Sequence, residues 1–117
     1  MKTAVISHSD CLLHEMGSDH PESPERLLAI EQHFQDTCLI QEVIEREAMP
    51  VTHEQILRVH PEAHIEHVLN TSPQEGLAEL DPDTQLCPHS VNAANLAAGS
   101  IVQAADDIMA GTYQRAF

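Results

Sequence analysis

The fold is decided near the N-terminus, by the segment His14-Glu15-Met16-Gly17-Ser18-Asp19-His20-Pro21-Glu22-Ser23-Pro24-Glu25-Arg26-Leu27-Leu28. Pro21 and Pro24 have fixed φ angles, and each pushes the residue before it toward extended geometry. Ser23 is a favourable N-cap, and Pro24 suits the first helical position, where a missing N–H does no harm. Residues 8–23 are therefore predicted to form a stiff loop that ends at a well-defined helix start, with Arg26 on the first helical turn.

Two runs on either side of this loop and helix predict a pair of strands. Residues 3–7 form a short apolar run, whereas residues 41–47 are ambiguous and favour a short strand because of their β-branched centre and the nearby Pro50. The helix between them is predicted over residues 24–35. Its apolar stripe consists of Leu27, Leu28, Ile30 and Phe34. The order strand, helix, strand implies a right-handed crossover and parallel pairing.

The rest of the chain predicts three more helices. Thr52 and Gln55 have the spacing of a capping box, so short helices are expected over residues 54–59 and 62–69. Residues 70–86 are expected to form a loop, and loops of that length are often functional. The longest helix is predicted over residues 88–110, with an Ala-rich run that allows close approach of a neighbour. Gly111 is its expected stop, and Ala116-Phe117 resemble the first residues of another strand.

The composition indicates one small, acidic domain. The 117 residues include 19 Asp and Glu but only 5 Lys and Arg, which gives a formal net charge of −14. Such a surface repels the phosphates of nucleic acids and anionic lipids, and it favours cationic partners such as basic peptides or polyamines. We therefore expect neither nucleic acid nor a membrane as a partner. A solvated acidic surface is the simpler interpretation of the charge.

The three cysteines, Cys11, Cys38 and Cys87, are odd in number and widely spaced. This pattern argues against a disulfide framework and favours a reducing compartment. The N-terminus lacks the apolar run of a signal peptide, and no apolar stretch approaches the length of a membrane span. The sequence therefore predicts a cytoplasmic protein.

Nine histidines raise the question of a metal site. One group is spaced to share a helical face, where two histidines four apart can bind zinc if a third ligand arrives. It consists of His60, His64 and His67. A second group, His8, His14 and His20, lies in or next to one loop. A partly exposed, His-rich helix is the simpler interpretation of the first group, and loops rarely supply all the ligands of a metal. No nucleophile motif is present either, so we assign neither metal ligands nor catalytic residues.

The segment Asp81-Pro82-Asp83-Thr84 is a compact acidic turn just before the longest predicted helix. An Asx-type hydrogen bond within the turn would account for its composition. Alternatively, the turn presents carboxylate oxygens to a substrate N–H or amine. Both interpretations remain open at the level of the sequence.

Taken in order, these segments resemble the zinc-dependent deacetylases: the histone deacetylases, acetoin-utilisation proteins and acetylpolyamine amidohydrolases. The string His14-x-x-Gly17-x-x-His20-Pro21-Glu22-x-Pro24-x-Arg26-Leu27 is similar to the family's first loop. Val59-His60-x-x-x-His64-x-x-x-Val68 is similar to its short helix pair, although the family usually has Tyr where His64 stands. The acidic turn, Pro88, Ser90 and the Ala-rich run are similar to its acidic loop and the helix that follows.

The resemblance also implies roles for individual residues. Arg26 matches the family's Arg beside the internal channel below the metal site. Asp81 or Asp83, between which the resemblance does not decide, matches the carboxylate that holds the substrate backbone at the pocket mouth, and His20 lies on the loop that shapes this mouth. The family's paired histidines, zinc ligands and catalytic Tyr would follow Phe117. The resemblance therefore implies no cofactor in this chain, whereas zinc is expected in full-length members.

We predict a single truncated deacetylase-like domain over residues 1–117. Its expected fold is α/β, the helix-rich N-terminal portion of an arginase-deacetylase fold with two short parallel strands and about four helices. Two strands leave open edges, so a homo-oligomer or the missing C-terminal portion is expected to cover them. The chain alone would then be inactive, and acetylated lysine and acetylpolyamines both remain open as substrates. The alternatives are a stand-alone binding or assembly module, and an active site formed between chains by the His-rich loop.

Overall fold

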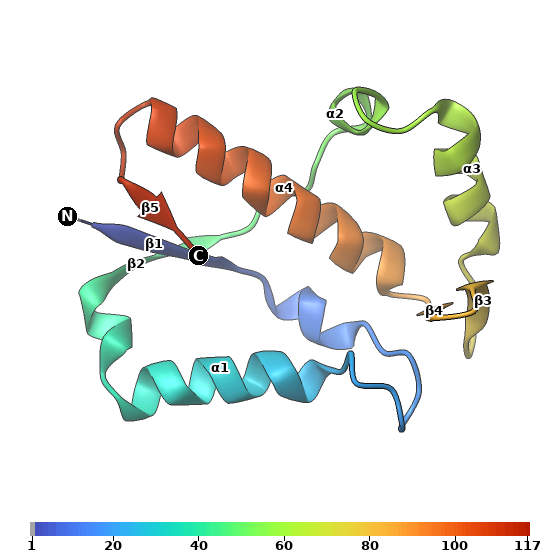
Figure 1. The fold of residues 1–117 in the computed structure, drawn as a ribbon, viewed down its shortest axis with the longest axis horizontal. Coiled ribbons are helices and arrows are strands. Elements are labelled where there is room, and N and C mark those ends of the chain that lie inside the picture. Colours follow the sequence, from blue (N-terminus) through green and yellow to red (C-terminus); the bar gives the residue numbers. More distant parts are fainter. Residues whose placement is uncertain (1) are drawn as a thin grey trace.

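A three-stranded parallel sheet lies at one end of the computed structural model, which describes residues 2–117 (Figure 1). In spatial order its strands are β2 (Val43–Glu47), β1 (Thr3–Ser7) and β5 (Arg115–Ala116). β1 pairs in parallel with β2 over its full length and with β5 over two residues. The predicted α/β class and the parallel pair are thus confirmed. The expected last strand is present but begins one residue earlier than predicted.

Two long helices, α1 (Pro24–Asp36) and α4 (Ser90–Met109), lie on either side of the sheet in the view of Figure 1. α1 begins at Pro24 as predicted, and Ser23 before it is extended. Ser23 is the N-cap residue as predicted, although its side chain makes no capping hydrogen bond. The predicted apolar stripe also needs a correction, because Leu28 lies on the outer side of α1 and is 48% exposed.

Close backbone contact fixes α4 against the segment that leaves β2. Gly99 on α4 is buried, and a Cβ atom there would overlap the carbonyl oxygen of Met49. The N–H of Val51 donates to the carbonyl oxygen of Asn95 at 2.9 Å. The Gln103 side chain accepts from the N–H of Met49 at 3.0 Å and donates to a carbonyl at the end of β2. The expected close approach along the Ala-rich run is therefore confirmed at Gly99.

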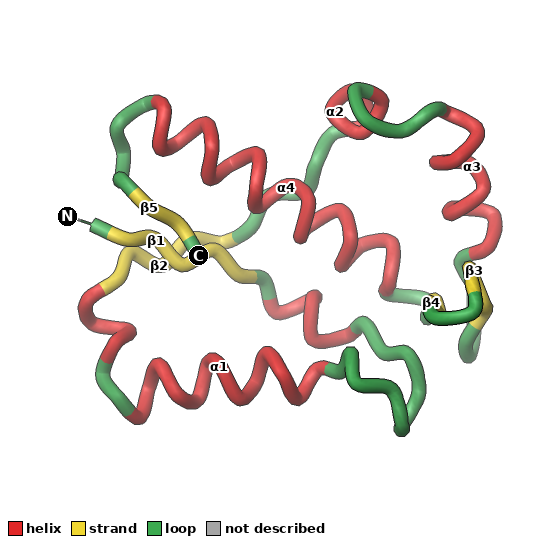
Figure 2. Tube along the Cα trace, viewed as in Figure 1, coloured by secondary structure: helices red, strands yellow, loops and turns green. Residues whose placement is uncertain are grey.

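The far end of the molecule holds two short helices and a hairpin (Figure 2). The elements are α2 (His53–Leu57), α3 (Glu62–Thr71), β3 (Ala78–Asp81) and β4 (Thr84–Leu86). The capping box of Thr52 and Gln55 is confirmed in both directions at the start of α2. The loop predicted over residues 70–86 is wrong in its second half, where β3 and β4 pair antiparallel. These strands have four and three residues and pair with an irregular register. They are too short to show the alternation of apolar and polar residues that predicts a strand.

Two 3₁₀ helices occupy parts of the chain that were predicted otherwise. η1 (Ser9–Leu13) follows β1 directly, where a loop was expected, and the Nδ1 of His8 accepts the N–H of Asp10 at its start. η2 (Leu39–Glu42) takes the first part of the strand predicted over residues 41–47, so that β2 begins at Val43. The positive φ of Cys38, 59°, turns the chain sharply before η2.

The structure is more open than a complete domain of this size. The buried apolar residues are Ala4, Ala48, Ile65, Leu86, Cys87, Ala93, Leu96 and Tyr113. The radius of gyration is 15.8 Å, whereas a compact domain of this length has about 13 Å. The accessible surface is 7961 Å², which exceeds the value for a compact monomer of this mass by roughly 1,600 Å². No helix within residues 2–117 combines the length and the apolarity needed to cross a membrane.

Candidate functional site

The loop of residues 14–22 lies against the β3–β4 hairpin, at one end of the molecule (Figure 1). The Sδ of Met16 accepts the N–H of Gln85 at 3.4 Å. Gly17 has a φ of 99°, which only glycine adopts readily, and the position of its missing Cβ lies 3.8 Å from Leu77. The loop is therefore attached to the hairpin by more than one contact.

His20 joins the loop to the acidic turn between β3 and β4. Its Nδ1 accepts the N–H of Glu22 at 3.0 Å, so the neutral ring carries its proton on Nε2. Nε2 lies 3.2 Å from the carbonyl oxygen of Asp83 and 3.4 Å from its Oδ1. The ring therefore donates to the Asp83 backbone, and the carboxylate of the same residue lies beside it.

The two carboxylates of the acidic turn have different surroundings. The Oδ1 of Asp81 accepts the N–H of Asp83 at 2.9 Å, which is the Asx-type hydrogen bond of the first of the two interpretations that the sequence left open. The Asp83 side chain is 97% exposed, and His20 is its sole ion-pair partner within residues 2–117. Asp81 thus closes the turn, whereas the Asp83 carboxylate faces solvent.

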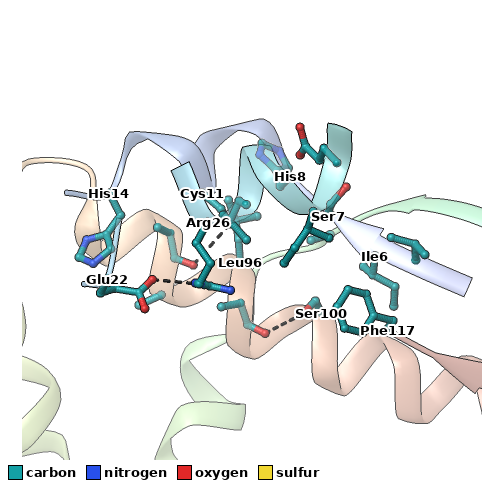
Figure 3. Close-up of a pocket in the computed structure, with 18 of the residues that line it drawn as sticks. Ile6, Ser7, His8, Cys11, His14, Glu22, Arg26, Leu96, Ser100 and Phe117 are labelled. Carbon is teal, nitrogen blue, oxygen red and sulfur yellow. Dashed lines mark hydrogen bonds and ion pairs between the residues drawn. The ribbon is translucent and has the colours of Figure 1, made fainter. Parts of the chain in front are cut away.

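Arg26 lies on the first turn of α1 and pairs with Glu22, one turn earlier, at 3.2 Å (Figure 3). The two side chains are 53% and 45% exposed, so the pair contributes at most about 1 kcal/mol. Because the N–H of Glu22 also donates to His20, Glu22 links Arg26 to the loop and the acidic turn. The structure therefore places His20 in direct contact with Asp83. Arg26 is linked to this pair indirectly, through Glu22.

An open cavity of about 810 Å³ lies between α1, η1, β1 and α4. Its lining is mostly apolar and includes Ile6, Leu27, Ile30, Phe34, Ala97 and Phe117. Its polar lining includes His14, Glu22, Arg26 and Ser90. Figure 3 shows His14 and Glu22 at one end of this cavity, Phe117 at the other, and Arg26 between them. The cavity is thus an apolar hollow with a small polar group of side chains at the end near the loop.

His14, Ser90 and Cys87 form a hydrogen-bonded cluster at the start of α4. The Nδ1 of His14 lies 2.7 Å from the Ser90 hydroxyl, which accepts the N–H of Cys87 at 2.8 Å and lies 3.4 Å from its Sγ. Burial alone would raise the pKa of the Cys87 thiol. Hydrogen bonds from Ser90 and from the backbone N–H groups of Glu15 and His89 outweigh burial and lower this pKa. All three cysteines are free.

The histidines do not converge on a metal site. Within residues 2–117, no group of three or more His, Cys, Asp or Glu side chains could hold a metal ion. The rings of His60 and His64 lie 5.0 Å apart, and no third ligand joins them among the described residues. His8 lies beside Asp10 and Glu47, whereas His14 contacts Ser90. The donor set present here therefore does not fit zinc, and we derive no step through a metal for this chain.

Comparison with known proteins agrees with the fold and with the order of the segments. Residues 20–117 match the family model of the histone deacetylase domain. The chain belongs to the histone deacetylase family. A probable deacetylase of Archaeoglobus fulgidus is 27% identical over 100% of this chain and 33% of its own length. A histone deacetylase-like amidohydrolase of Pseudomonas aeruginosa is 32% identical over 86% of this chain and 26% of its own length.

A solved structure has the same fold as this chain. The crystal structure of the HDA15 HD domain matches 100% of this chain with a TM-score of 0.90 and 30% identity. The match covers 34% of the HDA15 chain. This histone deacetylase family member therefore spans about a third of the length of the relatives that it matches.

The sequence pointed to the residues of the loop and the acidic turn, but not to the hydrogen-bonded cluster of His14, Ser90 and Cys87. Cys87 was considered solely as a marker of the redox compartment. The one available signal was Ser90 three residues after Cys87, a spacing at which a serine hydroxyl can accept a backbone N–H. Nothing in the sequence pairs His14 with Ser90, because 76 positions separate them.

Proposed function

We propose that this chain is the N-terminal part of a zinc-dependent deacetylase and supplies the mouth and one wall of its substrate site. The observation that carries the proposal is the open apolar cavity, lined by residues that a soluble protein normally covers. The excess of roughly 1,600 Å² in exposed surface is about twice the roughly 800 Å² that each partner buries in a standard protein interface. A chain that spans about a third of its relatives would leave such a surface for the remaining two-thirds.

The proposed division of labour follows from what amide hydrolysis requires. The reaction needs an electrophile and activated water, a general acid and base, and a donor for the oxyanion. The chemistry that zinc supplies in such enzymes is polarisation of the amide carbonyl and activation of the attacking water. No cluster of ligands for it lies within residues 2–117. The metal and the reacting groups would therefore come from sequence beyond Phe117, whereas this chain binds and orients the substrate.

The roles of the residues at the mouth follow from their surroundings. A carboxylate on the acidic turn would accept a hydrogen bond from a substrate N–H, as the resemblance implies. Arg26 would line the wall of the cavity, beside Glu22. The net charge of −14 favours a cationic substrate, such as an acetylated basic peptide or an acetylpolyamine.

The proposal is tested by comparing this chain with its natural continuation. The DNA beyond the Phe117 codon would be sequenced, and the 117-residue and extended proteins would be purified. Acetate release from an acetyl-lysine peptide and from an acetylpolyamine would be measured for both, together with bound zinc. We expect an in-frame continuation, hydrolysis and stoichiometric zinc in the extended protein, and neither activity nor zinc in the 117-residue chain.

Two outcomes would contradict the proposal. A stop codon after Phe117, with a folded and oligomeric 117-residue protein, would support a stand-alone assembly module. Zinc-dependent hydrolysis by the 117-residue protein would instead support an active site formed between chains.

A further inference from the structure

We propose that a second hollow in this chain binds a small amphipathic carboxylate, with the apolar tail inside the hollow and the carboxylate beside His60 and His64. This hollow, the helical groove, has a volume of about 470 Å³ and lies between α2, α3 and α4. The inference goes beyond the proposed function, because the helical groove is separate from the proposed substrate site.

The helical groove and the open cavity lie on opposite faces of α4. The α4 residues that line the groove alone are Val91, Asn95, Ala98 and Val102. Those that line the open cavity alone are Ala93, Leu96, Ala97 and Ser100. At 3.6 residues per turn, the two sets point in opposite directions. In the view of Figure 1, α2 and α3 accordingly lie on the other side of α4 from α1. A continuation that covers the open cavity therefore leaves the helical groove free.

The lining of the helical groove differs from the rest of this acidic chain. Most of it is apolar and includes Ile56 and Val68. No Asp, Glu, Lys or Arg side chain lines it within residues 2–117, although the chain has 19 acidic residues. The open cavity, by contrast, is lined by Glu22, Glu31 and Glu45. The volume and the largely apolar lining of the groove are those of a small-molecule site.

The polar groups of the groove offer donors to a ligand. The rings of His60 and His64 lie 5.0 Å apart, and neither makes a hydrogen bond or an ion pair within residues 2–117. The other histidine of the lining, His53, is already paired with Glu62 at 3.0 Å. A neutral imidazole donates one N–H, and a protonated imidazole donates two. A ligand carboxylate can therefore accept from both free rings at once.

A negative head group suits this lining better than a positive one. A carboxylate would meet two imidazoles with no acidic side chain beside them in the lining, whereas a cation would find no carboxylate to pair with. At physiological ionic strength the Debye length is about 8 Å, so the acidic residues outside the groove are largely screened. Burial of the tail thus provides affinity, and the two rings provide selectivity for the head group.

The walls of the helical groove are held in place without a ligand. The N–H of Val51 donates to the carbonyl oxygen of Asn95 at 2.9 Å, which holds the segment before α2 against α4. The N–H of His60 donates to the carbonyl oxygen of Ile56 at 2.9 Å, and the side chain of Ile65 anchors α3 because it is buried. A groove that is already formed costs less conformational freedom when a ligand binds.

The first experiment titrates octanoate into the 117-residue chain and follows binding by calorimetry and by backbone amide signals in NMR. We expect saturable binding of one octanoate per chain, with a Kd of about 1 mM. The amide signals of His60, His64 and Asn95 should shift. Octan-1-ol and octyltrimethylammonium carry the same tail, and each should bind at least about fivefold more weakly. Equal binding of the three compounds would overturn the assignment of the head group, and binding that does not saturate would overturn the site.

Two neighbouring alanines on α4 provide a matched pair that locates the site. Both are exposed, but Ala98 lines the helical groove and Ala97 lines the open cavity. Ala98→Phe should fill the groove and raise the Kd for octanoate at least about tenfold, whereas Ala97→Phe should leave it within about twofold. The reverse pattern would place octanoate in the open cavity and overturn the proposal. Circular dichroism verifies that both variants are folded.

Substitution of the two histidines tests the contact with the head group and decides the question even if Ala98→Phe does not fold. His60→Ala and His64→Ala should each weaken octanoate binding at least about threefold and change octan-1-ol binding by less than about twofold. The control is His67→Ala, which lies on α3 but outside the lining of the groove. Unchanged octanoate affinity in both variants, or an equal loss in His67→Ala, would overturn the role of the two rings.

The outcome can be separated from that of the proposed function. The extended protein should bind octanoate with a similar Kd, because the groove lies on the face of α4 away from the open cavity. Loss of octanoate binding in the extended protein would overturn the proposal, since the groove would then be an internal surface. If the extended protein hydrolyses no acetylated substrate, the proposed function fails, and the octanoate titrations still decide the groove.

Discussion

Tyr113 lies in the short connection between α4 and β5. It is 2% exposed, and its hydroxyl donates to the Oδ2 of Asp107 at 2.9 Å. Burial raises the pKa of the Tyr113 hydroxyl, the hydrogen bond and the charge of Asp107 raise it further, and Arg46 lowers it in part. The folded chain therefore holds this proton more tightly than the unfolded chain does.

The raised pKa predicts a loss of stability at alkaline pH. The contribution of Tyr113 is complete below the ordinary pKa of 10.0 and is lost as the pH rises through the folded value. Tyr113→Phe should remove this dependence and lower the free energy of unfolding at neutral pH by about 1 kcal/mol. Urea unfolding of both proteins at neutral and alkaline pH measures the difference. Since the chain has one tyrosine, ultraviolet absorbance reports its titration directly, and an ordinary pKa would contradict the prediction.

At the level of the elements, Gly99 decides how closely α4 approaches the segment after β2. A Cβ atom at this position would meet three backbone atoms, of Met49, Pro50 and Val51. Backbone atoms cannot move aside as a flexible side chain can. Gly99→Ala should therefore lower the free energy of unfolding by at least about 2 kcal/mol, although Ala favours a helix over Gly by about 1 kcal/mol.

The matched control is the reverse change on the exposed side of the same helix. Ala105→Gly should cost about 1 kcal/mol, because helix propensity is the sole property that changes there. Urea unfolding of the two variants compares these effects. Stabilisation by Gly99→Ala would show that the segment after β2 can move away from α4.

Local signals predicted the helices of this chain, because a cap, a proline and an apolar period lie within a few residues of each other. The capping box before α2 and the start of α1 at Pro24 are examples. The β3–β4 hairpin was missed because its strands are short and its register is irregular. The contact of His20 with Asp83 spans 63 positions, so it depends on how the loop and the hairpin meet. The site residues of the loop and the acidic turn could thus be named from the sequence, but their pairing and the cluster around Cys87 could not.

At the level of the whole molecule, the central question is what covers the open cavity between α1, β1 and α4. A second copy of this chain would add a further net charge of −14 to a molecule that is already strongly acidic. The continuation of a deacetylase domain has a different sequence, so it need not repel this chain in the same way. The proposed function therefore predicts that a charge placed in the cavity is harmless in the 117-residue chain and harmful in the extended protein.

Ala97 allows this prediction to be tested, because it lies on α4, lines the cavity and is exposed in this chain. Ala97→Glu should change the free energy of unfolding of the 117-residue chain by less than about 0.5 kcal/mol. In the extended protein the same carboxylate would be buried without a partner, and the loss should reach several kcal/mol, with a matching loss of active protein. Ala105→Glu, on the same helix but outside the cavity, should be tolerated in both. Equal tolerance of the two substitutions in the extended protein would mean that its continuation packs elsewhere, since a buried, unpaired charge cannot be accommodated without cost.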